Sequence, residues 1–197
     1  TLAPDGRIAT LLGKHPDGSS SAAPATHMFT GISILEPDFL DFLPEGPHCL
    51  VRNGFMPWFL KGGSLFAHVL DDDVYWWEHS TPARYLQGNC NLFLPHVRRH
   101  FENELPYRHP WVIAAPNAQL PDNVTVEGPL VLGPGASVAP GVRLKNVVAW
   151  ENTRIHHDLQ DAVATPAGIV AVDLAHPGAT VGPPLQTGAP PPDGRGP

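Results

Sequence analysis

The residue types most capable of chemistry lie around one short stretch, 74–85, which has the sequence VYWWEHSTPARY. Its first four residues are aromatic or β-branched, as is typical of a strand. Thr81 and Pro82 are the residue types of a helix N-cap and first helical position. Glu78 therefore falls in a turn between a strand and a helix, where ligands and catalytic side chains collect in open α/β sheets. A carboxylate there could hold a divalent cation that bridges phosphates, or it could be a solvated acid near the helix N-terminus.

Two further positions could contribute to the same chemistry. Lys14 follows a short predicted strand, and its ammonium could neutralise a phosphate as a point charge; a surface lysine without such a role is the alternative. Gly31 lies inside a second predicted strand, where it could bring a bare backbone group against a sugar hydroxyl or form a simple bulge. Three other polar groups are better explained as a solvated turn, a helix surface and a loop insertion: Asp71–Asp73, His96 with His100, and His156–Asp158.

The length, composition and net charge of the chain narrow the class of protein. The chain has 197 residues, is 42% hydrophobic and carries a formal net charge of -7. An acidic chain without a long basic run is a poor candidate for binding nucleic acid or a membrane surface, and no run approaches the ~18 apolar residues of a membrane span. Cys49 and Cys90 are too few for a disulfide framework and fit a reducing compartment. With no signal-peptide pattern at the N-terminus, a cytoplasmic location is expected.

The first half of the chain alternates predicted strands and helices. Strands are predicted over 7–12, 27–35, 64–70 and 74–77, the last two as a hairpin, and helices over 37–43, 50–60 and 82–99. This alternation is typical of an α/β domain. We expect that domain to occupy residues 1–95, and residues 96–109 to form the helix end and a linker.

A different period begins after Pro110. Apolar residues recur every six positions at Leu120, Val126, Leu132, Val138, Leu144 and Trp150, and a second series accompanies them at Val124, Leu130, Ala136, Val142 and Val148. A period of six matches a triangular parallel β-helix in which each face takes one hexapeptide and the first series points inward. A left-handed β-helix is therefore predicted over 110–172, with a register slip at His156–Asp158. The Gly/Pro-rich residues 173–197 are predicted to be disordered.

Three stretches together resemble a known family. They are Phe29-Thr30-Gly31-Ile32, Leu35-Glu36-Pro37 and Val74–Leu86, with the predicted β-helix behind them. The chain resembles the C-terminal half of a sugar-1-phosphate nucleotidyltransferase, in the branch of NDP-sugar pyrophosphorylases and bacterial mannose-1-phosphate guanylyltransferases. The equivalent turn of that family is Tyr-Trp-x-Asp-Ile-Gly-Thr-Pro-x-x-Tyr-Leu. The resemblance implies an α/β partial nucleotidyltransferase domain, Rossmann-like in fold, followed by a left-handed parallel β-helix.

The resemblance also implies a reaction. In the family, the oxygen of a sugar 1-phosphate attacks the α-phosphorus of a nucleoside triphosphate and pyrophosphate leaves, with Mg²⁺ and basic residues neutralising charge. Glu78 stands where the family has its metal-binding Asp, so it is the expected Mg²⁺ ligand. Lys14 stands where the family has a lysine that contacts phosphate, and it is the expected catalytic residue. Thr30 and Gly31 are the expected substrate-binding residues, because the family glycine lies against the sugar.

The resemblance covers residues 1 to about 172 and leaves several functions open. The family's Gly-rich nucleotide loop, G-x-x-T-R-x-x-P, does not occur in these residues, so the isolated chain is expected to have no turnover. One reading is the sugar-binding half of the enzyme. Another is a non-catalytic assembly or regulatory subunit. It is favoured by the absence of the family's first half from these residues and by Glu78, Gly13 and Ser80, where the family has Asp, Glu and Gly. In either case the β-helix is expected to bind a second copy or a partner. A hexapeptide-repeat acyltransferase is a third alternative, with His156 or His157 as its catalytic residue.

Overall fold

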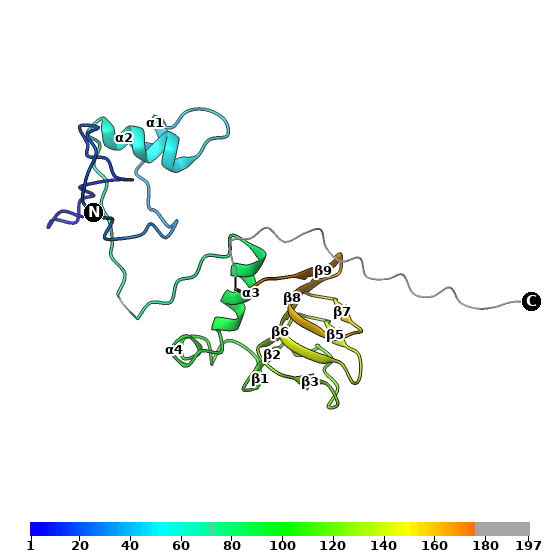
Figure 1. The fold of residues 1–197 in the computed structure, drawn as a ribbon. Helices are drawn as coiled ribbons and strands as arrows, with labels where there is room; N and C mark the ends of the chain where they lie inside the picture. Colours follow the sequence, from blue (N-terminus) through cyan, green and yellow to red (C-terminus); the bar gives the residue numbers. More distant parts are fainter. Residues whose placement is uncertain (72, 176–197) are drawn as a thin grey trace, which may run out of the picture. The chain divides into compact units, whose positions relative to one another are not determined.

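The computed structural model of the chain describes residues 1–71 and 73–175. The chain divides into two compact units: unit 1, Thr1–Trp76, and unit 2, Trp77–Pro197. Every labelled strand lies in unit 2 (Figure 1). The predicted disordered tail lies outside the described residues from 176 onward. In the described ranges, no helix combines the length and the apolar character needed to cross a membrane.

Unit 1 is organised around short helical segments and a cluster of aromatic rings. The helical segments are α1 (Pro37–Phe42), the π-helical turn η1 (Leu50–Phe55) and α2 (Met56–Leu60). Phe39 stacks on Phe55 with ring centroids 5.2 Å apart, and it meets Trp58 edge to face at 5.5 Å. Both helices predicted in this region are therefore confirmed, and aromatic packing holds them together.

The strands predicted in unit 1 are not formed. The described part of the unit contains isolated bridges in place of ladders, at Leu2–Ile8, Arg7–Phe66, Leu11–Lys14 and Lys14–Ser20. Residues 27–35 belong to no ladder, and neither do the described residues of the predicted hairpin. A strand needs a neighbour to bond its backbone groups, and high β-propensity in one segment does not supply that neighbour. The expected Rossmann-like sheet is thus not seen in residues 1–71 and 73–76.

Unit 2 is a β-solenoid of about three turns with two helices before it. Its elements are α3 (Pro82–Asn91), α4 (Pro95–Arg98), β1 (Tyr107–His109), β2 (Val112–Ala114), β3 (Thr125–Val126), β4 (Leu130–Leu132), β5 (Ser137–Val138), β6 (Arg143–Ala149), β7 (Arg154–Ile155), β8 (Leu159–Thr165) and β9 (Gly168–Ala171). Strands β2, β4, β6 and β8 pair in parallel and form one face. β5 pairs with β7 on a second face, and β3 pairs with the start of β6 on a third. The predicted parallel β-helix is therefore confirmed as a β-solenoid.

The two ends of the solenoid differ from the prediction. β1, which was expected to be linker, pairs antiparallel with β2, and β9 pairs antiparallel with β8 where a further coil was expected. The predicted helix over 82–99 is divided into α3 and α4. Pro95 begins the second of these, because proline lacks the N–H that a continuous helix would need at that position.

Strand pairing gives the length of each coil. Val112 pairs with Leu130, 18 positions later, which is the length of three hexapeptides. Leu130 pairs with Val147, 17 positions later. The next coil is shorter again, because Leu144 pairs with Leu159 after 15 positions. This last shortening falls between the end of β7 and the start of β8, where the slip at His156–Asp158 was predicted.

The coil between Leu130 and Val147, which is one residue shorter than the first, contradicts part of the predicted series of inward-facing residues. β6 turns a corner at Asn146, whose φ is 51°, and this corner is one residue shorter than the corresponding corner after Val126. As a result Val147 and Ala149 are buried, whereas Trp150 is 49% exposed. The prediction that Trp150 points into the solenoid is wrong for this reason.

Helix α3 packs on the outer face of the solenoid. Ala83 and Leu86 of the helix are buried against three valines of successive strands, Val131, Val148 and Val163. The ribbon shows α3 beside the strands β6 and β8 (Figure 1). Helix α3 is therefore anchored to the solenoid.

Candidate functional site

The turn that carries Glu78 lies at the start of unit 2. Thr81 is the N-cap of α3, and its side-chain oxygen accepts a hydrogen bond from the Arg84 backbone N–H at 3.1 Å. Pro82 occupies the first helical position, as predicted. Residues 74–77, predicted as a strand, belong to no β-ladder of the described residues. The helix half of the predicted strand–turn–helix is therefore confirmed, and its strand half is wrong.

The Glu78 carboxylate is engaged by a cation of its own chain. Arg84 Nη1 donates to Glu78 Oε2 at 2.9 Å, and the two side chains are 46% and 49% exposed. An exposed ion pair of this kind contributes little to stability, about 0–1 kcal/mol. Its chemical consequence is larger, because any Mg²⁺ at Glu78 has to compete with the guanidinium.

Aromatic residues on either side of Glu78 fix its backbone against α3. Trp77 Nε1 donates to the Arg84 carbonyl at 2.8 Å, and the His79 ring meets the Tyr85 ring edge to face at 5.7 Å. A Cβ at Gly88 would lie 2.4 Å from His79 Cε1 and 2.6 Å from Trp77 Cδ1. Gly88 therefore makes room for both rings. Sequence reasoning missed this residue, although a glycine inside a predicted helix was the available signal.

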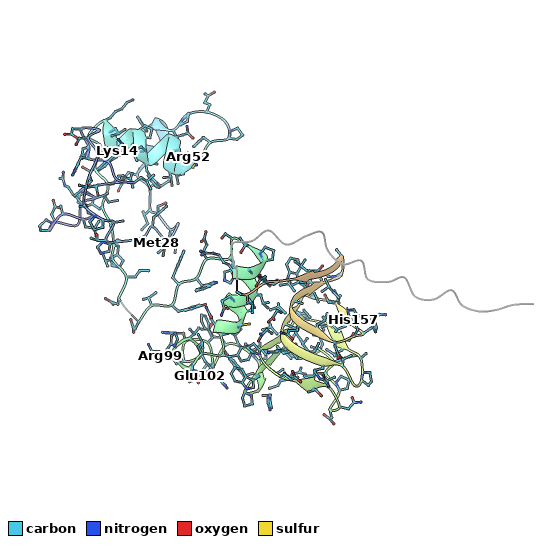
Figure 2. All side chains as sticks on the ribbon, viewed as in Figure 1. Lys14, Met28, Arg52, Arg99, Glu102 and His157 are labelled. Carbon is cyan, nitrogen blue, oxygen red and sulfur yellow. The ribbon has the colours of Figure 1, made fainter. Side chains whose placement is uncertain are left out.

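Lys14 lies in a tight turn of unit 1. Leu11 and Lys14 form a bridge around Leu12 and Gly13, both of which have positive φ, 48° and 76°. The Lys14 ammonium donates to Ser20 Oγ at 2.9 Å and is exposed (labelled in Figure 2). The turn thus presents an accessible ammonium, and only a neutral hydroxyl has to be released for it to meet a phosphate.

Thr30 and Gly31 lie within residues 27–35 of unit 1, which belong to no β-ladder. The Thr30 carbonyl accepts a hydrogen bond from Trp76 Nε1 at 3.2 Å. Gly31 has φ +86°, and a Cβ built on it would meet nothing within 4 Å. The glycine is therefore required by its backbone angle and leaves open space beside the main chain. The expected role of Gly31 as a bare backbone group beside a sugar stays a prediction.

The predicted site residues fall in both units, and each is described within its own unit. In unit 1, none of the hydrogen bonds and ion pairs of the described residues joins Lys14 to Thr30 or Gly31. Glu78 belongs to unit 2. The role of the four residues as one site stays a prediction.

Other candidate ligands gain no support from the described ranges. These hold no group of three or more His, Cys, Asp or Glu side chains arranged to bind a metal. Asp158 Oδ1 accepts from the Arg143 backbone N–H at 2.7 Å, which gives it a structural role at a corner of the solenoid. His157 is exposed on the outside of the solenoid (Figure 2).

A groove of about 340 Å³ lies beside α3 on the outer face of the solenoid. Tyr85 and Asn89 of the helix line one side, and Trp150 and Glu151 line the other. The Tyr85 and Trp150 rings meet edge to face at 6.3 Å. Glu78 is not among the lining residues, so the groove is separate from the predicted metal ligand.

Comparison with known proteins agrees with this architecture. The described solenoid and the sequence similarity together fit a sugar-1-phosphate nucleotidyltransferase-like, hexapeptide-repeat protein. The chain is 26% identical over 154 residues to the mannose-1-phosphate guanylyltransferase of Mycobacterium tuberculosis. The match covers 76% of this chain and 39% of that relative, so the chain spans about two fifths of the relative's length. The chain matches no protein-family model.

Proposed function

We propose that the chain forms the sugar-phosphate-binding part of a sugar-1-phosphate nucleotidyltransferase. The full reaction joins a nucleoside triphosphate and a sugar 1-phosphate to give an NDP-sugar and pyrophosphate. One observation carries the proposal: the turn motif around Glu78 is packed through α3 on a parallel solenoid, in a chain 26% identical to a mannose-1-phosphate guanylyltransferase. Because the chain spans 39% of that relative, we expect no turnover from the chain alone.

The proposed roles follow from the chemistry of each group. The exposed ammonium of Lys14 neutralises the phosphate of the sugar phosphate as a mobile point charge. Gly31 and the neighbouring Thr30 offer backbone and hydroxyl groups to sugar hydroxyls. The open space beside Gly31 supports a close approach of the ligand to the main chain.

Glu78 is the proposed protein ligand of Mg²⁺. A single carboxylate agrees with the way this ion is usually bound, through one or two carboxylates together with substrate phosphates and water. When bound, Mg²⁺ neutralises charge on phosphate oxygens. The Arg84 guanidinium now occupies Glu78 Oε2 and has to move aside, after which it is itself a cation available to a phosphate.

The finer description of the solenoid is also a proposal. We propose that its coils are left-handed and derive from hexapeptide repeats. The 18-residue spacing between Val112 and Leu130 supports three hexapeptides per coil. The shorter later coils then represent deletions at corners.

Equilibrium binding tests the proposed site. Isothermal titration of mannose 1-phosphate in the presence of Mg²⁺ is expected to show saturable binding to the wild-type chain. Lys14→Gln is expected to weaken it about tenfold or more, because a charge-assisted contact contributes about 1.5–3 kcal/mol. Lys145→Gln, which removes a lysine of the solenoid, is the matched control and should bind like wild type. Absence of saturable binding, or equal affinities of Lys14→Gln and wild type, would contradict the proposed site.

A second function is a non-catalytic assembly or regulatory subunit. The Glu78–Arg84 ion pair favours it, because the proposed metal ligand is already neutralised. In this case the solenoid binds a second copy or a partner. A chain that self-associates in sedimentation experiments yet binds neither sugar phosphate nor nucleotide would support this alternative over the first.

A further inference from the structure

The groove beside α3 has an aromatic side chain on each side. Tyr85 lines it from the helix and Trp150 from the solenoid, and the valines Val131 and Val148 of β4 and β6 line it as well. Trp150 is on the outside of the solenoid because the corner at Asn146 is one residue shorter than the corresponding corner of the coil before. A departure from the regular repeat has therefore built one side of the groove, and such departures are typical of functional surfaces.

The polar groups of the groove are available to a ligand. Among the described residues, Trp150 Nε1 and the Tyr85 hydroxyl have no hydrogen-bond partner, and the exposed Glu151 carboxylate forms no ion pair. Grooves lined by aromatic rings with donors at their edges bind polyproline II segments. A polyproline II segment has no internal hydrogen bonds, so its carbonyls are free to accept from such donors.

The C-terminal residues of this chain have the composition of such a segment. Residues 176–197 lie outside the described residues, and their sequence contains seven prolines, three of them consecutive at Pro190–Pro192. Consecutive prolines favour polyproline II, because each ring fixes φ at about −65°. Arg195 follows this run, and its positive charge is complementary to Glu151 of the groove.

We propose that the groove binds the proline-rich end of its own chain, residues 190–195. Pro190–Pro192 pack on the rings of Tyr85 and Trp150, and Trp150 Nε1 donates to a carbonyl of the proline run. Arg195 then lies beside Glu151. This role of the groove is independent of the proposed sugar-phosphate site, because Glu78, Lys14 and Gly31 do not line the groove.

The last described residues bring the C-terminal segment close to the groove. Val172 is buried in the cluster that holds α3 on the solenoid, and Leu174 packs against the same cluster. Val131 and Val148, which line the groove, also belong to this set of contacts. The segment therefore leaves the described structure at the apolar contacts beside which the groove lies.

The length of chain between Leu174 and Pro190 is sufficient for this return. The two residues are 16 positions apart, and a flexible chain of that length has an r.m.s. span of about 20–24 Å. Helix α3 has 10 residues and is therefore only about 15 Å long. Because the segment is tethered, its effective concentration at the groove is on the order of millimolar. Even a weak contact with the rings is then well populated.

Nuclear magnetic resonance of the full ¹⁵N-labelled chain tests the inference. The probe is the indole N–H signal of Trp150, which is assigned by its loss in Trp150→Phe. In the triple variant Pro190→Ser/Pro191→Ser/Pro192→Ser this proton is expected to exchange with water at least about tenfold faster, since a hydrogen-bonded and covered N–H is protected. The matched control, Pro183→Ser/Pro184→Ser, removes the other proline pair and should keep the wild-type rate.

Binding in trans provides a second measurement. A synthetic peptide of residues 188–197, added to the triple variant, is expected to shift the Trp150 indole signal saturably. Glu151→Gln in the same background should weaken this binding about two- to fivefold, as is usual for an exposed ion pair. Glu127→Gln removes a carboxylate of the solenoid that does not line the groove, and should leave the peptide affinity unchanged.

Each other result overturns the inference. Equal exchange of the Trp150 indole in the wild type and in both proline variants, or the absence of saturable peptide binding, would show that the segment does not occupy the groove. Protection of the indole that is lost on dilution of the wild-type chain would assign the groove to the C-terminal segment of a second copy. Protection that survives the triple variant and rises with mannose 1-phosphate would assign the groove to a sugar.

Discussion

Units 1 and 2 contain segments of similar β-propensity that have opposite structural outcomes. In unit 2, Leu130 and Leu144 are fully buried and their strands are paired in parallel. In unit 1, Ile34 is fully exposed and its segment has no ladder partner in the described residues. The difference lies in where a partner strand can come from. Each parallel strand of the solenoid pairs with another strand 15–18 positions away in the same chain, whereas none of the described residues forms a ladder with residues 27–35, here called segment 27–35.

The largest effect expected from this difference is in amide exchange. The amides of β4, β6 and β8 should exchange at least about 1,000-fold more slowly than those of segment 27–35. The reason is that exchange from a packed ladder requires an opening of several kcal/mol, whereas unpaired backbone needs almost none. Exchange followed by mass spectrometry on the isolated chain provides the measurement.

Equal protection of the amides in segment 27–35 and in the solenoid strands would contradict this comparison. Comparable protection would mean that segment 27–35 is paired in solution. Rapid exchange in β6 would instead mean that the solenoid does not form a stable core. The two results are distinguishable because each concerns a different peptide.

A substitution pair should give the next largest effect. Leu144→Ala removes a fully buried side chain from the solenoid core and should destabilise the chain by about 2–5 kcal/mol. Ile34→Ala removes a fully exposed side chain and should change stability by less than about 0.5 kcal/mol. Urea unfolding followed by far-UV circular dichroism, where the solenoid dominates the signal, would measure both. A cost at Ile34 equal to that at Leu144 would show that Ile34 is buried in solution.

The sequence predicted the solenoid because its pattern repeats and its partners are local. A period of six that repeats over several coils remains recognisable even where one corner is irregular. The corner at Asn146 could not be foreseen, because an asparagine can adopt positive φ but need not. Once the chain turned one residue early, Trp150 moved from the predicted inside to the outside. The six-residue period therefore predicted the architecture, and the backbone conformation at Asn146 decided which of the residues that follow it face inward.

The candidate site was predictable where the signal was local. Thr81 and Pro82 specified the start of α3, because capping involves neighbouring residues only. The Glu78–Arg84 ion pair spans six positions across an irregular turn, and no periodic rule places those side chains together. The prediction of strands in unit 1 was wrong because strand formation is not a local property. Their propensity was read correctly, but pairing depends on residues that propensity does not describe.

The two cysteines extend the comparison between the units to reactivity. Burial, with a smaller contribution from Asp161, raises the pKa of the Cys90 thiol on α3 to about 11. Hydrogen bonds from the backbone N–H groups of Arg52 and Val51 lower the pKa of the exposed Cys49 thiol in unit 1. Because the thiolate is the nucleophile, a disulfide reagent at pH 8 should modify Cys49 about 100-fold or more faster than Cys90. Single-cysteine variants Cys49→Ser and Cys90→Ser would assign the fast and slow phases.

The raised pKa of Cys90 also gives a pH dependence with a definite sign. The folded chain keeps this thiol protonated, whereas the unfolded chain ionises it near the ordinary thiol pKa of about 8.5. The stabilising contribution is therefore complete below about pH 8.5 and is lost as the pH rises toward about 11. Cys90→Ser should flatten this part of the stability curve in urea titrations, and Cys49→Ser should not. If both thiols of the folded chain react at the same rate and Cys90→Ser leaves the curve unchanged, then α3 does not bury Cys90 against the solenoid in solution.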